Sequence, residues 1–395
     1  MNAQLTGTDR AHLKRALELA EGGRGRVSPN PLVGAVLVRD GAVIGEGFHA
    51  ELGGLHAERA TLEDCLKRGE DPAGATMYVT LEPCAHQGRQ PPCTEAILEA
   101  GIGRVVIGSE DPSEKASGRG PGILRDGGVE VELAAGEEAT AARLLNQPFR
   151  KHSRSGLPLV ILKMAISLDG RSTTAPGDSP WISGATSRER VHRWRAESDA
   201  IAVGIGTVLA DDPLLTARHG EDPRQPMRVV FDSQARLPLD SQLLVSIDQA
   251  PVIVVTVPDA DSARLAALGD AGAEVLVAGG STETDRIKSA LSDLGRRGLT
   301  SVLLEGGATL AGAFAAAEQV DEARSFVAPV VLGVQGSGPT AASRAGGVGD
   351  GGVEDAPARS APPSRATGPA RLSALSSHSE MVGEDVLITA RFREW

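Results

Sequence analysis

The chain has 395 residues, enough for two domains of ordinary size, and 41% of them are hydrophobic, which supports packed cores. Only 3% are aromatic, so we expect Val, Leu, Ile and Ala to build those cores. The formal net charge of −12 argues against a polyanionic partner, because nothing offsets phosphate repulsion over the whole molecule, although a local basic pocket could still hold a small phosphorylated ligand.

The first ~150 residues alternate between helical and strand patterns. A helix is predicted over residues 8–23 with Asp9 as its cap, and Asp40-Gly41 is a strong hairpin signal between two strands within 32–49. Further helices are predicted from about His56 to Arg68 and over 94–101. Strands are predicted at 75–81, 104–109 and 129–133. This order predicts an αβα sandwich with a mixed sheet.

Residues 145–158 are polar and basic and contain Pro and Gly, which indicates a boundary between domains at 1–150 and 151–395. The second part contains short apolar strands separated by helical segments, which predicts a mainly parallel sheet covered on both faces. These strands lie at 159–167, 200–204, 228–232, 251–257, 273–278 and 301–307. Residues 384–395 look like a last strand that returns to the sheet.

One segment of the second part breaks this pattern. From Gly333 to Arg371 the chain is mostly Gly, Ala, Pro and Ser, and it contains no Leu, Ile, Phe, Tyr or Trp. Such a segment cannot bury enough apolar surface to become ordered. We therefore predict a disordered insertion near 334–371, with a functional loop as the alternative.

The three cysteines are unevenly placed. Cys65 lies in a helical pattern and is most simply a small buried thiol, whereas Cys84 and Cys93 each follow a proline. The first twenty residues lack the apolar core of a secretory signal, so we expect a cytoplasmic location. In a reducing compartment, paired cysteines near a histidine indicate a metal site in preference to a disulfide.

The candidate metal ligands are His56, Cys84 and Cys93. One imidazole and two thiolates suit zinc, and three protein ligands leave the fourth tetrahedral position to water, as in a catalytic site. Glu58, two residues after the histidine, could move a proton between water and a leaving amine. The alternative is a structural zinc that recruits His86 as its fourth ligand and leaves Glu58 on the surface. From the sequence alone, a pocket position and a surface position are almost equally expected for His86.

The H-x-E pattern, followed by Pro-Cys and a second cysteine, resembles the zinc-dependent cytidine-deaminase superfamily. The nine-residue spacing of the cysteines, "NPLVGAVLV" at 30–38 and "EPCAHQGRQPPC" at 82–93 are similar to the deaminase domain of the bifunctional riboflavin-biosynthesis deaminase–reductase family over residues ~8–150. The resemblance implies that His56, Cys84 and Cys93 hold one zinc ion and that Glu58 is the proton shuttle.

The same resemblance implies a pyrimidine pocket lined by Asn30, His49 and His86. Gln87, Gln90 and the pair Ser113-Glu114 depart from the family pattern. These departures concern substrate contacts on the loop rim and leave the zinc ligands intact.

In the second part, the residues alone give a weaker signal. Gly204 and Gly206 lack the third glycine of a dinucleotide-binding fingerprint. Gly306-Gly307 ends a predicted strand and opens a helix, whose free N–H groups could hold phosphate, or it could be a tight turn with no ligand. Most arginines of 186–200 read as an exposed helix face, and Arg195, beside a tryptophan, is the exception.

Several stretches of this part look like the reductase domain of the same family: "LKMAISLDGR", "GDSPWISG", "HRWRAESDAIAVGIGTVLADDPLLTAR", "QPMRVVFDS" and "LLEGGATLAGAF". The resemblance implies a dihydrofolate-reductase-like α/β domain that uses NADPH. The implied cofactor contacts are Ala165, Trp181, Thr207, Asp211, Ser233, Gly307, Ala308, Thr309, Leu310, Ala311, Gly312 and Ala313. The implied substrate contacts are Ser179, Arg195, Leu215, Arg218 and Glu305, with the two arginines suited to a ribose phosphate.

The leading hypothesis is therefore a bifunctional enzyme of riboflavin biosynthesis, both hydrolase and oxidoreductase. It would deaminate 2,5-diamino-6-(5-phosphoribosylamino)pyrimidin-4(3H)-one and then reduce the ribosyl group of 5-amino-6-(5-phosphoribosylamino)uracil to ribityl. Alternatives are an active deaminase with a scaffold in place of the reductase, a nucleic-acid-editing deaminase, and a non-catalytic zinc-stabilised interaction protein. The charge of −12 counts against nucleic acid. We expect a small phosphorylated pyrimidine as partner, no membrane, and a homo-oligomer.

Overall fold

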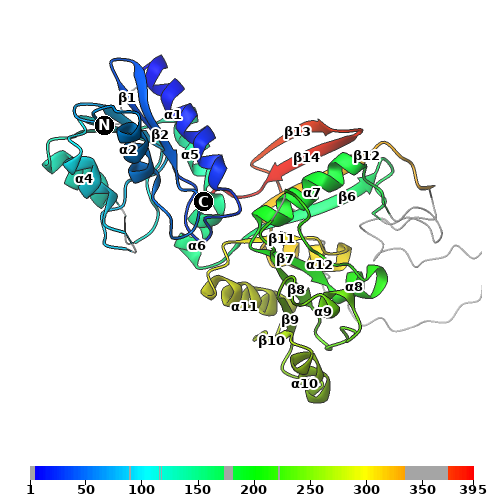
Figure 1. Cartoon of the computed structure of the whole chain (residues 1–395). Helices are drawn as coiled ribbons and strands as arrows, with labels where there is room; N and C mark the ends of the chain where they lie inside the picture. Colours follow the sequence, from blue (N-terminus) through cyan, green and yellow to red (C-terminus); the bar gives the residue numbers. More distant parts are fainter. Residues whose placement is uncertain are drawn as a thin grey trace, which may run out of the picture.

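The computed structural model describes residues 5–88, 90–114, 116, 118–172, 181–220, 223–333 and 372–395. These residues form one sheet of five strands and one of nine (Figure 1). The predicted insertion at 334–371 and the candidate substrate residue Ser179 lie outside the described residues. No described helix is long and apolar enough to span a membrane.

The first sheet has the strand order β2-β1-β3-β4-β5. Its strands are β1 (Gly34–Arg39), β2 (Ala42–Phe48), β3 (Thr76–Val79), β4 (Arg104–Ile107) and β5 (Glu130–Leu133). Its helices are α1 (Gly7–Ala20), α2 (Ala57–Lys67), α3 (Cys93–Glu99), α4 (Arg119–Asp126) and α5 (Gly136–Leu145). β1 is antiparallel to β2 and β3, whereas β3, β4 and β5 are parallel, so the sheet is mixed, as predicted.

Side-chain alternation along β1 shows why helices cover both faces of this sheet. Ala35 and Leu37 pack with α2, α3 and α4 in one apolar cluster. Val36 and Val38 point the other way and pack with α1 and α5. The predicted hairpin is confirmed, since Asp40 and Gly41 join β1 to β2 with φ angles of 51° and 79°.

The start of α1 differs from the prediction. Thr6, not Asp9, is the N-cap, and its hydroxyl accepts the Asp9 N–H at 3.1 Å. Asp9 returns the bond by accepting the Thr6 N–H at 2.9 Å, which completes a capping box. Asp9 is buried and also accepts from Tyr78 and Arg104, so its role is to join α1 to the sheet.

The second sheet has the order β10-β9-β8-β7-β11-β6-β12-β14-β13. Its strands are β6 (Leu159–Ser167), β7 (Ala200–Gly204), β8 (Met227–Phe231), β9 (Val252–Thr256), β10 (Glu274–Val277), β11 (Ser301–Leu304), β12 (Glu322–Ala328), β13 (Ser376–Val382) and β14 (Asp385–Arg391). Its helices are α7 (Ala185–Glu197), α8 (Ile205–Asp211), α9 (Gln242–Val245), α10 (Ser262–Asp270), α11 (Glu283–Arg296) and α12 (Ala308–Ala316).

The strands from β10 to β12 are parallel, and only β14 and β13 are antiparallel to their neighbours. Ala200 and Ala202 of β7 pack in the cluster that includes α11 and α12. Ile201 and Val203 face the opposite cluster with α9 and α10. The prediction of a mainly parallel sheet covered on both faces is confirmed, and the carboxyl ends of β8, β7 and β11 share one edge.

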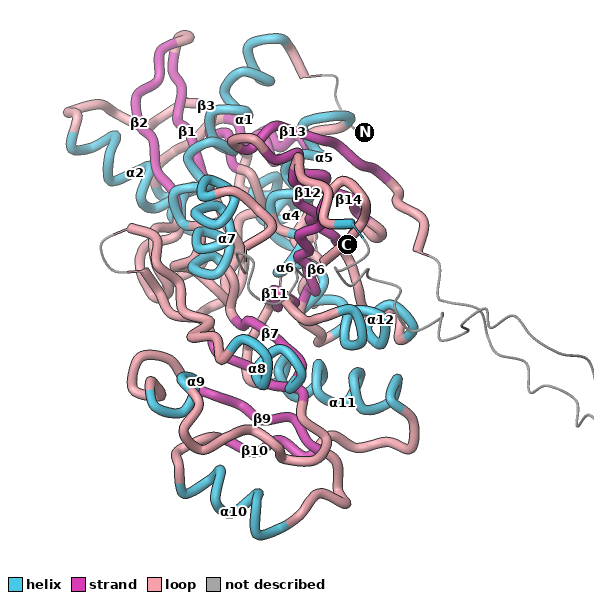
Figure 2. The backbone as a smooth tube through the Cα atoms, turned by 90° about the vertical axis from the view of Figure 1, so that its right-hand side faces the viewer, coloured by secondary structure: helices cyan, strands magenta, loops and turns pink. Residues whose placement is uncertain are grey.

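The division predicted between residues 150 and 151 falls inside a helix, α6 (Gln147–Ser155). In Figure 1 α6 lies between the two sheets, and Figure 2 shows it beside β6, the strand that follows it. Arg150 and Lys151 are fully buried. Arg150 donates a hydrogen bond to Glu110, which lies in the loop after β4. Lys151 donates one of 2.6 Å to Asp321, the residue directly before β12. Adjacent residues of α6 therefore join the two parts.

Candidate functional site

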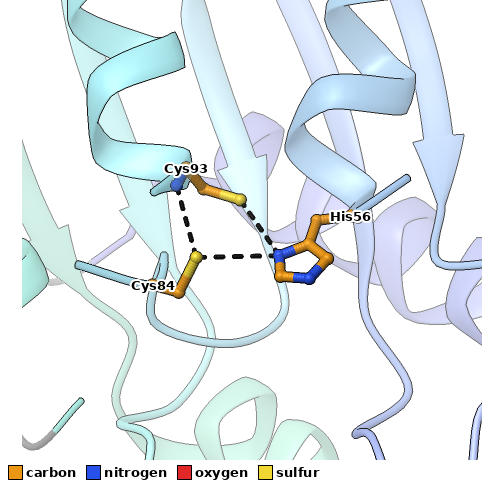
Figure 3. Close-up of side chains that lie close together, drawn as sticks. All are labelled: His56, Cys84 and Cys93. Atoms are coloured by element: carbon orange, nitrogen blue, oxygen red, sulfur yellow. Dashed lines mark hydrogen bonds between the residues drawn. The ribbon is translucent and has the colours of Figure 1, made fainter. Parts of the chain in front are cut away.

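The three candidate metal ligands come together at one end of the first sheet (Figure 3). His56 is the N-cap of α2, Cys93 is the first residue of α3, and Cys84 lies in the loop after β3. The Nδ1 atom of His56 lies 3.3 Å from the Cys93 sulfur and 3.6 Å from the Cys84 sulfur. All three cysteines of the chain are free thiols.

This donor set fits zinc. One imidazole nitrogen and two sulfurs lie within 4.8 Å of one another, and such a trio can surround a tetrahedral ion with one position open. His86 is not a member of the group. The geometry of the described residues therefore favours the open, catalytic type of site over the closed, structural type.

The site also favours a thiolate. A hydrogen bond from the Cys93 thiol, together with the His56 imidazole and the Cys93 backbone N–H, lowers the pKa of the Cys84 thiol to about 4. The N–H of Cys93 donates to the Cys84 sulfur at 3.2 Å. Because α3 begins at Cys93, its N-terminal partial charge adds to this stabilisation.

Glu58 is buried in the first turn of α2. Burial is the main cause that raises the pKa of its carboxyl, and the neighbouring Cys84 raises it further. A carboxyl in this setting holds a proton more readily than an exposed glutamate does. That property suits a group that takes up a proton and gives it back.

Asn30 and His49 are also brought together beside this set. The Nδ1 of His49 lies 2.8 Å from the Leu55 carbonyl, which can only accept, so Nδ1 carries the proton. The Nε2 atom then accepts from the side-chain amide of Asn30 at 3.1 Å. Burial lowers the pKa of His49, which keeps this ring neutral. The His49 and His56 ring centroids are 5.5 Å apart.

His86 is half-buried on the loop after Cys84. Its Nδ1 atom is buried and has no hydrogen-bond partner within the described part of the chain. Burial raises the pKa of the Asp111 carboxyl, and the nearby His86 opposes this only in part. An unpartnered ring nitrogen at this position suits a ligand contact, which agrees with the pocket interpretation.

Two residues hold this site together in a way that the sequence did not predict. Gln90 donates to the Gly54 carbonyl at 2.7 Å and accepts from the His56 N–H at 3.4 Å, so it fixes the two ligand loops to each other. Glu82 is buried, and its carboxylate accepts the backbone N–H groups of Gly118 and Gly120. In the sequence, the role of Glu82 was indicated only by its position directly before Pro83 and Cys84.

A second group of candidate residues lies at the carboxyl end of β11. Glu305 follows this strand and accepts from Arg195 of α7 through two bonds, Nε–Oε1 at 2.7 Å and Nη2–Oε2 at 2.9 Å. The remaining nitrogen of Arg195 donates to the Thr216 carbonyl at 3.3 Å. Arg195 thus uses every arm of its guanidinium within the protein.

The other candidate substrate residues flank this ion pair. Arg218 is exposed, and its Nη2 lies 3.2 Å from the Nε2 of His192, which is one turn from Arg195 on α7. Leu215 is buried, and its φ of 52° turns the chain three residues before Arg218. Burial raises the pKa of the Glu305 carboxyl, but the charge and hydrogen bonds of Arg195 and the charge of Lys163 outweigh it and lower that pKa. Lys163 of β6 was not identified from the sequence.

The candidate cofactor residues follow the carboxyl edge of the same sheet. α8 follows β7 and α12 follows β11, and neither helix has a side-chain N-cap bond, so their first N–H groups are open. A Cβ placed on Gly307 would meet the Thr207 hydroxyl at 3.8 Å, and one on Gly306 would press on Leu310 at 3.0 Å. The two helix starts are therefore adjacent, and the glycine turn leaves a cradle that fits a dinucleotide phosphate.

The remaining candidate cofactor residues are more dispersed. Ala165 lies in β6, Asp211 is exposed at the end of α8, and Ser233 follows β8. The Trp181 side chain is 61% exposed, and the Arg188 guanidinium lies 5.2 Å from its ring centroid. Thr207, Gly307 and the first turns of α12 form one cluster, and Ser233 extends it along the edge.

Two family models match the chain. One is described as the RibD C-terminal domain and matches residues 158–346, and the other is the cytidine and deoxycytidylate deaminase zinc-binding region and matches 6–109. The riboflavin biosynthesis protein RibD of Actinobacillus pleuropneumoniae is 39% identical over 390 residues, 98% of this chain and 96% of that protein. RibD of Escherichia coli is 38% identical over 342 residues, 84% of this chain and 90% of that protein.

Solved structures give the same result. A diaminohydroxyphosphoribosylaminopyrimidine deaminase/5-amino-6-(5-phosphoribosylamino)uracil reductase from Thermotoga maritima is similar with a TM-score of 0.79 and 34% identity, over 98% of this chain and 99% of that one. Acinetobacter baumannii RibD is similar with a TM-score of 0.79 and 35% identity, over the same shares of the two chains.

Proposed function

Because the chain belongs to the RibD family of riboflavin-biosynthesis proteins, we propose a role for each site residue in the two reactions of that family. The chain is a bifunctional enzyme that combines a diaminohydroxyphosphoribosylaminopyrimidine deaminase with a 5-amino-6-(5-phosphoribosylamino)uracil reductase. Zinc is the cofactor of the first activity and NADPH of the second.

In the deaminase part, His56, Cys84 and Cys93 would hold the zinc ion. When bound, zinc lowers the pKa of water and so makes a nucleophile available at neutral pH. Glu58 takes up a proton on its carboxylate and returns it to the departing amine nitrogen. Its burial supports this role, because a carboxyl with a raised pKa holds the proton between the two transfers.

Asn30, His49 and His86 would orient the pyrimidine. The protonated Nδ1 of His49 fixes the ring as an acceptor at Nε2, which turns the amide nitrogen of Asn30 toward it. The Asn30 carbonyl oxygen is then left to accept from an N–H of the base. His86 offers its unpartnered Nδ1 from the loop that follows Cys84.

In the reductase part, NADPH supplies the hydride that converts the ribosyl group to ribityl. Gly307, the first turns of α12 (308–313) and Thr207 would hold its phosphates. Ala165, Trp181, Asp211 and Ser233 would contact the rest of the cofactor. The bidentate bond from Arg195 orients Glu305 for a substrate hydroxyl. Arg218, exposed and not paired with any described carboxylate, would bind the ribose phosphate, and Leu215 would border it.

We further propose that the deaminase part comprises residues 1–150 and the reductase part 151–395, with α6 at the junction. The enzyme acts on small molecules, and we propose the cytoplasm as its location because its site needs reduced thiols.

We also propose that the protein is a homo-oligomer. The exposed edge strand β13 supports this, because it offers unpaired backbone groups. Sedimentation at several protein concentrations tests the oligomer.

One observation carries the assignment: two sulfurs and one imidazole nitrogen lie within 4.8 Å of one another, beside a buried glutamate. The test is to give the zinc-loaded chain the diamino substrate and NADPH, and to follow ammonia release and NADPH absorbance together. We expect one NADPH oxidised for each ammonia released. Ammonia release without NADPH oxidation would mean that the second part is only a scaffold. If neither ammonia release nor NADPH oxidation occurred, the chain would be a non-catalytic interaction protein.

A further inference from the structure

A cavity of about 520 Å³ opens at the carboxyl ends of β8 and β9. Its lining comes from the loops after these two strands and from the first turns of α10 and α11. Ser233 lies in this lining, and its carbonyl accepts a hydrogen bond from Thr256, the last residue of β9, at 3.3 Å. The cavity therefore shares one residue with the candidate cofactor set.

Three arginines from three separate segments line the cavity. Arg236 comes from the loop after β8, Arg264 from α10 and Arg286 from α11. Arg264 and Arg286 form no ion pair with any described residue, and the buried Nε of Arg286 has no hydrogen-bond partner among them. Arg236 has only a long contact with Asp232 at 3.9 Å. The guanidinium groups of Arg264 and Arg286 are therefore left without an anion by the described part of the protein.

Two aspartates also line the cavity. Asp261 is occupied, because it accepts the N–H groups of Ala263 at 2.8 Å and Arg264 at 3.4 Å as the cap of α10. Asp259 is the second. Three arginines against two aspartates give the lining a formal charge of +1, whereas the whole chain carries −12. The cavity is thus a local positive site on an acidic protein.

The position of the cavity relates it to the cofactor edge. β8 and β9 are the next two strands after β7, and all three are parallel, so their carboxyl ends lie in a row. Neighbouring strands are about 5 Å apart, so the ends of β8 and β9 lie about 5 and 10 Å from the start of α8 along the edge. Ligands of open α/β sheets bind along this edge.

On the basis of the proposed reductase function, we propose that this cavity binds the 2′-phosphate of NADPH through Arg264 and Arg286, with Arg236 beside them. A guanidinium can donate two parallel hydrogen bonds to a phosphate group. NADH carries a hydroxyl at the same place and gives these arginines no anion. The three arginines therefore determine the preference for NADPH over NADH.

The test is calorimetric binding of NADP+ and NAD+ to the zinc-loaded full chain, which does not depend on turnover. Replacing both arginines (Arg264→Gln with Arg286→Gln) should weaken NADP+ binding by roughly ten- to a hundredfold and leave NAD+ binding unchanged. The matched control is Arg296→Gln on the same helix α11, where Arg296 pairs with Asp293 at the surface. It should change neither affinity. In competition, 2′-AMP should bind the wild type more tightly than 5′-AMP and lose this advantage in the double variant.

The negative outcomes distinguish failure of the phosphate assignment from failure of the reductase function. A double variant that keeps its NADP+ affinity, or loses NADP+ and NAD+ binding equally, overturns the phosphate assignment while the reductase function stands. Loss of ribose 5-phosphate binding with NADP+ binding intact also overturns it, because the cavity would then serve the substrate. A wild type that binds neither nucleotide removes the reductase function itself and the cavity proposal with it.

Discussion

Arg195 and Glu305 form a buried bidentate ion pair between α7 and the end of β11, with bonds of 2.7 and 2.9 Å. Their side chains are only 13% and 9% exposed. Arg195 has no free arm for a phosphate, so the pair itself is the functional unit. Its members must be considered together when either one is changed.

Removal of Arg195 alone should be strongly destabilising, because it leaves the Glu305 carboxylate buried without its main cation. We expect Arg195→Ala to lower the free energy of unfolding by about 3 kcal/mol, measured by urea denaturation followed through tryptophan fluorescence. Arg193→Ala is the control, since Arg193 pairs with Glu197 at the surface and should cost less than about 1 kcal/mol. Combining Arg195→Ala with Glu305→Gln should be less harmful than Arg195→Ala alone. Equal losses in both would show that the pair is not coupled.

Arg218 should serve the substrate and not the cofactor. We expect Arg218→Ala to raise the KM for the phosphorylated pyrimidine about tenfold, because one charge-assisted bond is lost, with little change in NADPH affinity. Arg190→Ala is a matched control, because Arg190 lies on α7 and pairs with the exposed Glu380. A main loss in NADPH binding instead would reassign Arg218 to the cofactor.

The first part should lose stability in acid through Asp9. Burial alone would raise the pKa of this carboxyl, but hydrogen bonds from Arg104, Thr6 and Tyr78 outweigh it and hold the pKa well below its usual value. The unfolded chain therefore binds a proton that the folded chain does not. The stabilisation is complete above about pH 5 and is lost as the pH falls through about 4 toward the folded pKa.

Asp9→Asn should accordingly lower the melting temperature at pH 7 and flatten its decline below about pH 5. Thermal melts from pH 3 to 8 measure both effects. Asp285→Asn, which removes the matching capping-box carboxylate of α11 at an exposed position, is the control and should change the profile less. A parallel decline in the wild type and Asp9→Asn would exclude Asp9 as the cause.

Metal content should depend on three side chains only. Cys93→Ser and His56→Ala should each lose most of the bound zinc, because a three-ligand site has no spare donor. His86→Ala should retain full occupancy, measured by elemental analysis after dialysis. Zinc loss from His86→Ala would restore the closed, structural site.

Local sequence signals predicted the parts of the fold whose causes are local. The Asp40-Gly41 hairpin and the helix that begins after His56 depend on neighbouring residues, and both are confirmed. Thr6 was missed as the cap of α1 because Asp9 has the same cap chemistry and lies only three residues away. Either residue suits a helix start, and only the backbone geometry decides between them.

The contacts across long sequence distances could not be predicted in the same way. The stretch around Arg150 and Lys151 reads as polar and basic, yet both side chains are buried because Glu110 and Asp321 provide partners from far along the chain. Glu82 and Gln90 in the deaminase site act through backbone groups of other loops. Backbone partners leave no pattern in a sequence, so these residues required the structure.

The two chemistries of this chain should be separable, and Glu58→Gln is the variant that separates them. Glutamine keeps the shape of Glu58 but cannot take up the proton, so deamination should fall by roughly a hundred- to ten-thousandfold while zinc is retained. Given the diamino substrate and NADPH, this variant should release almost no ammonia and oxidise almost no NADPH. Addition of the deaminated pyrimidine should then restore NADPH oxidation to the wild-type rate. Ammonia release at the wild-type rate, or added intermediate that is not reduced, would contradict the account.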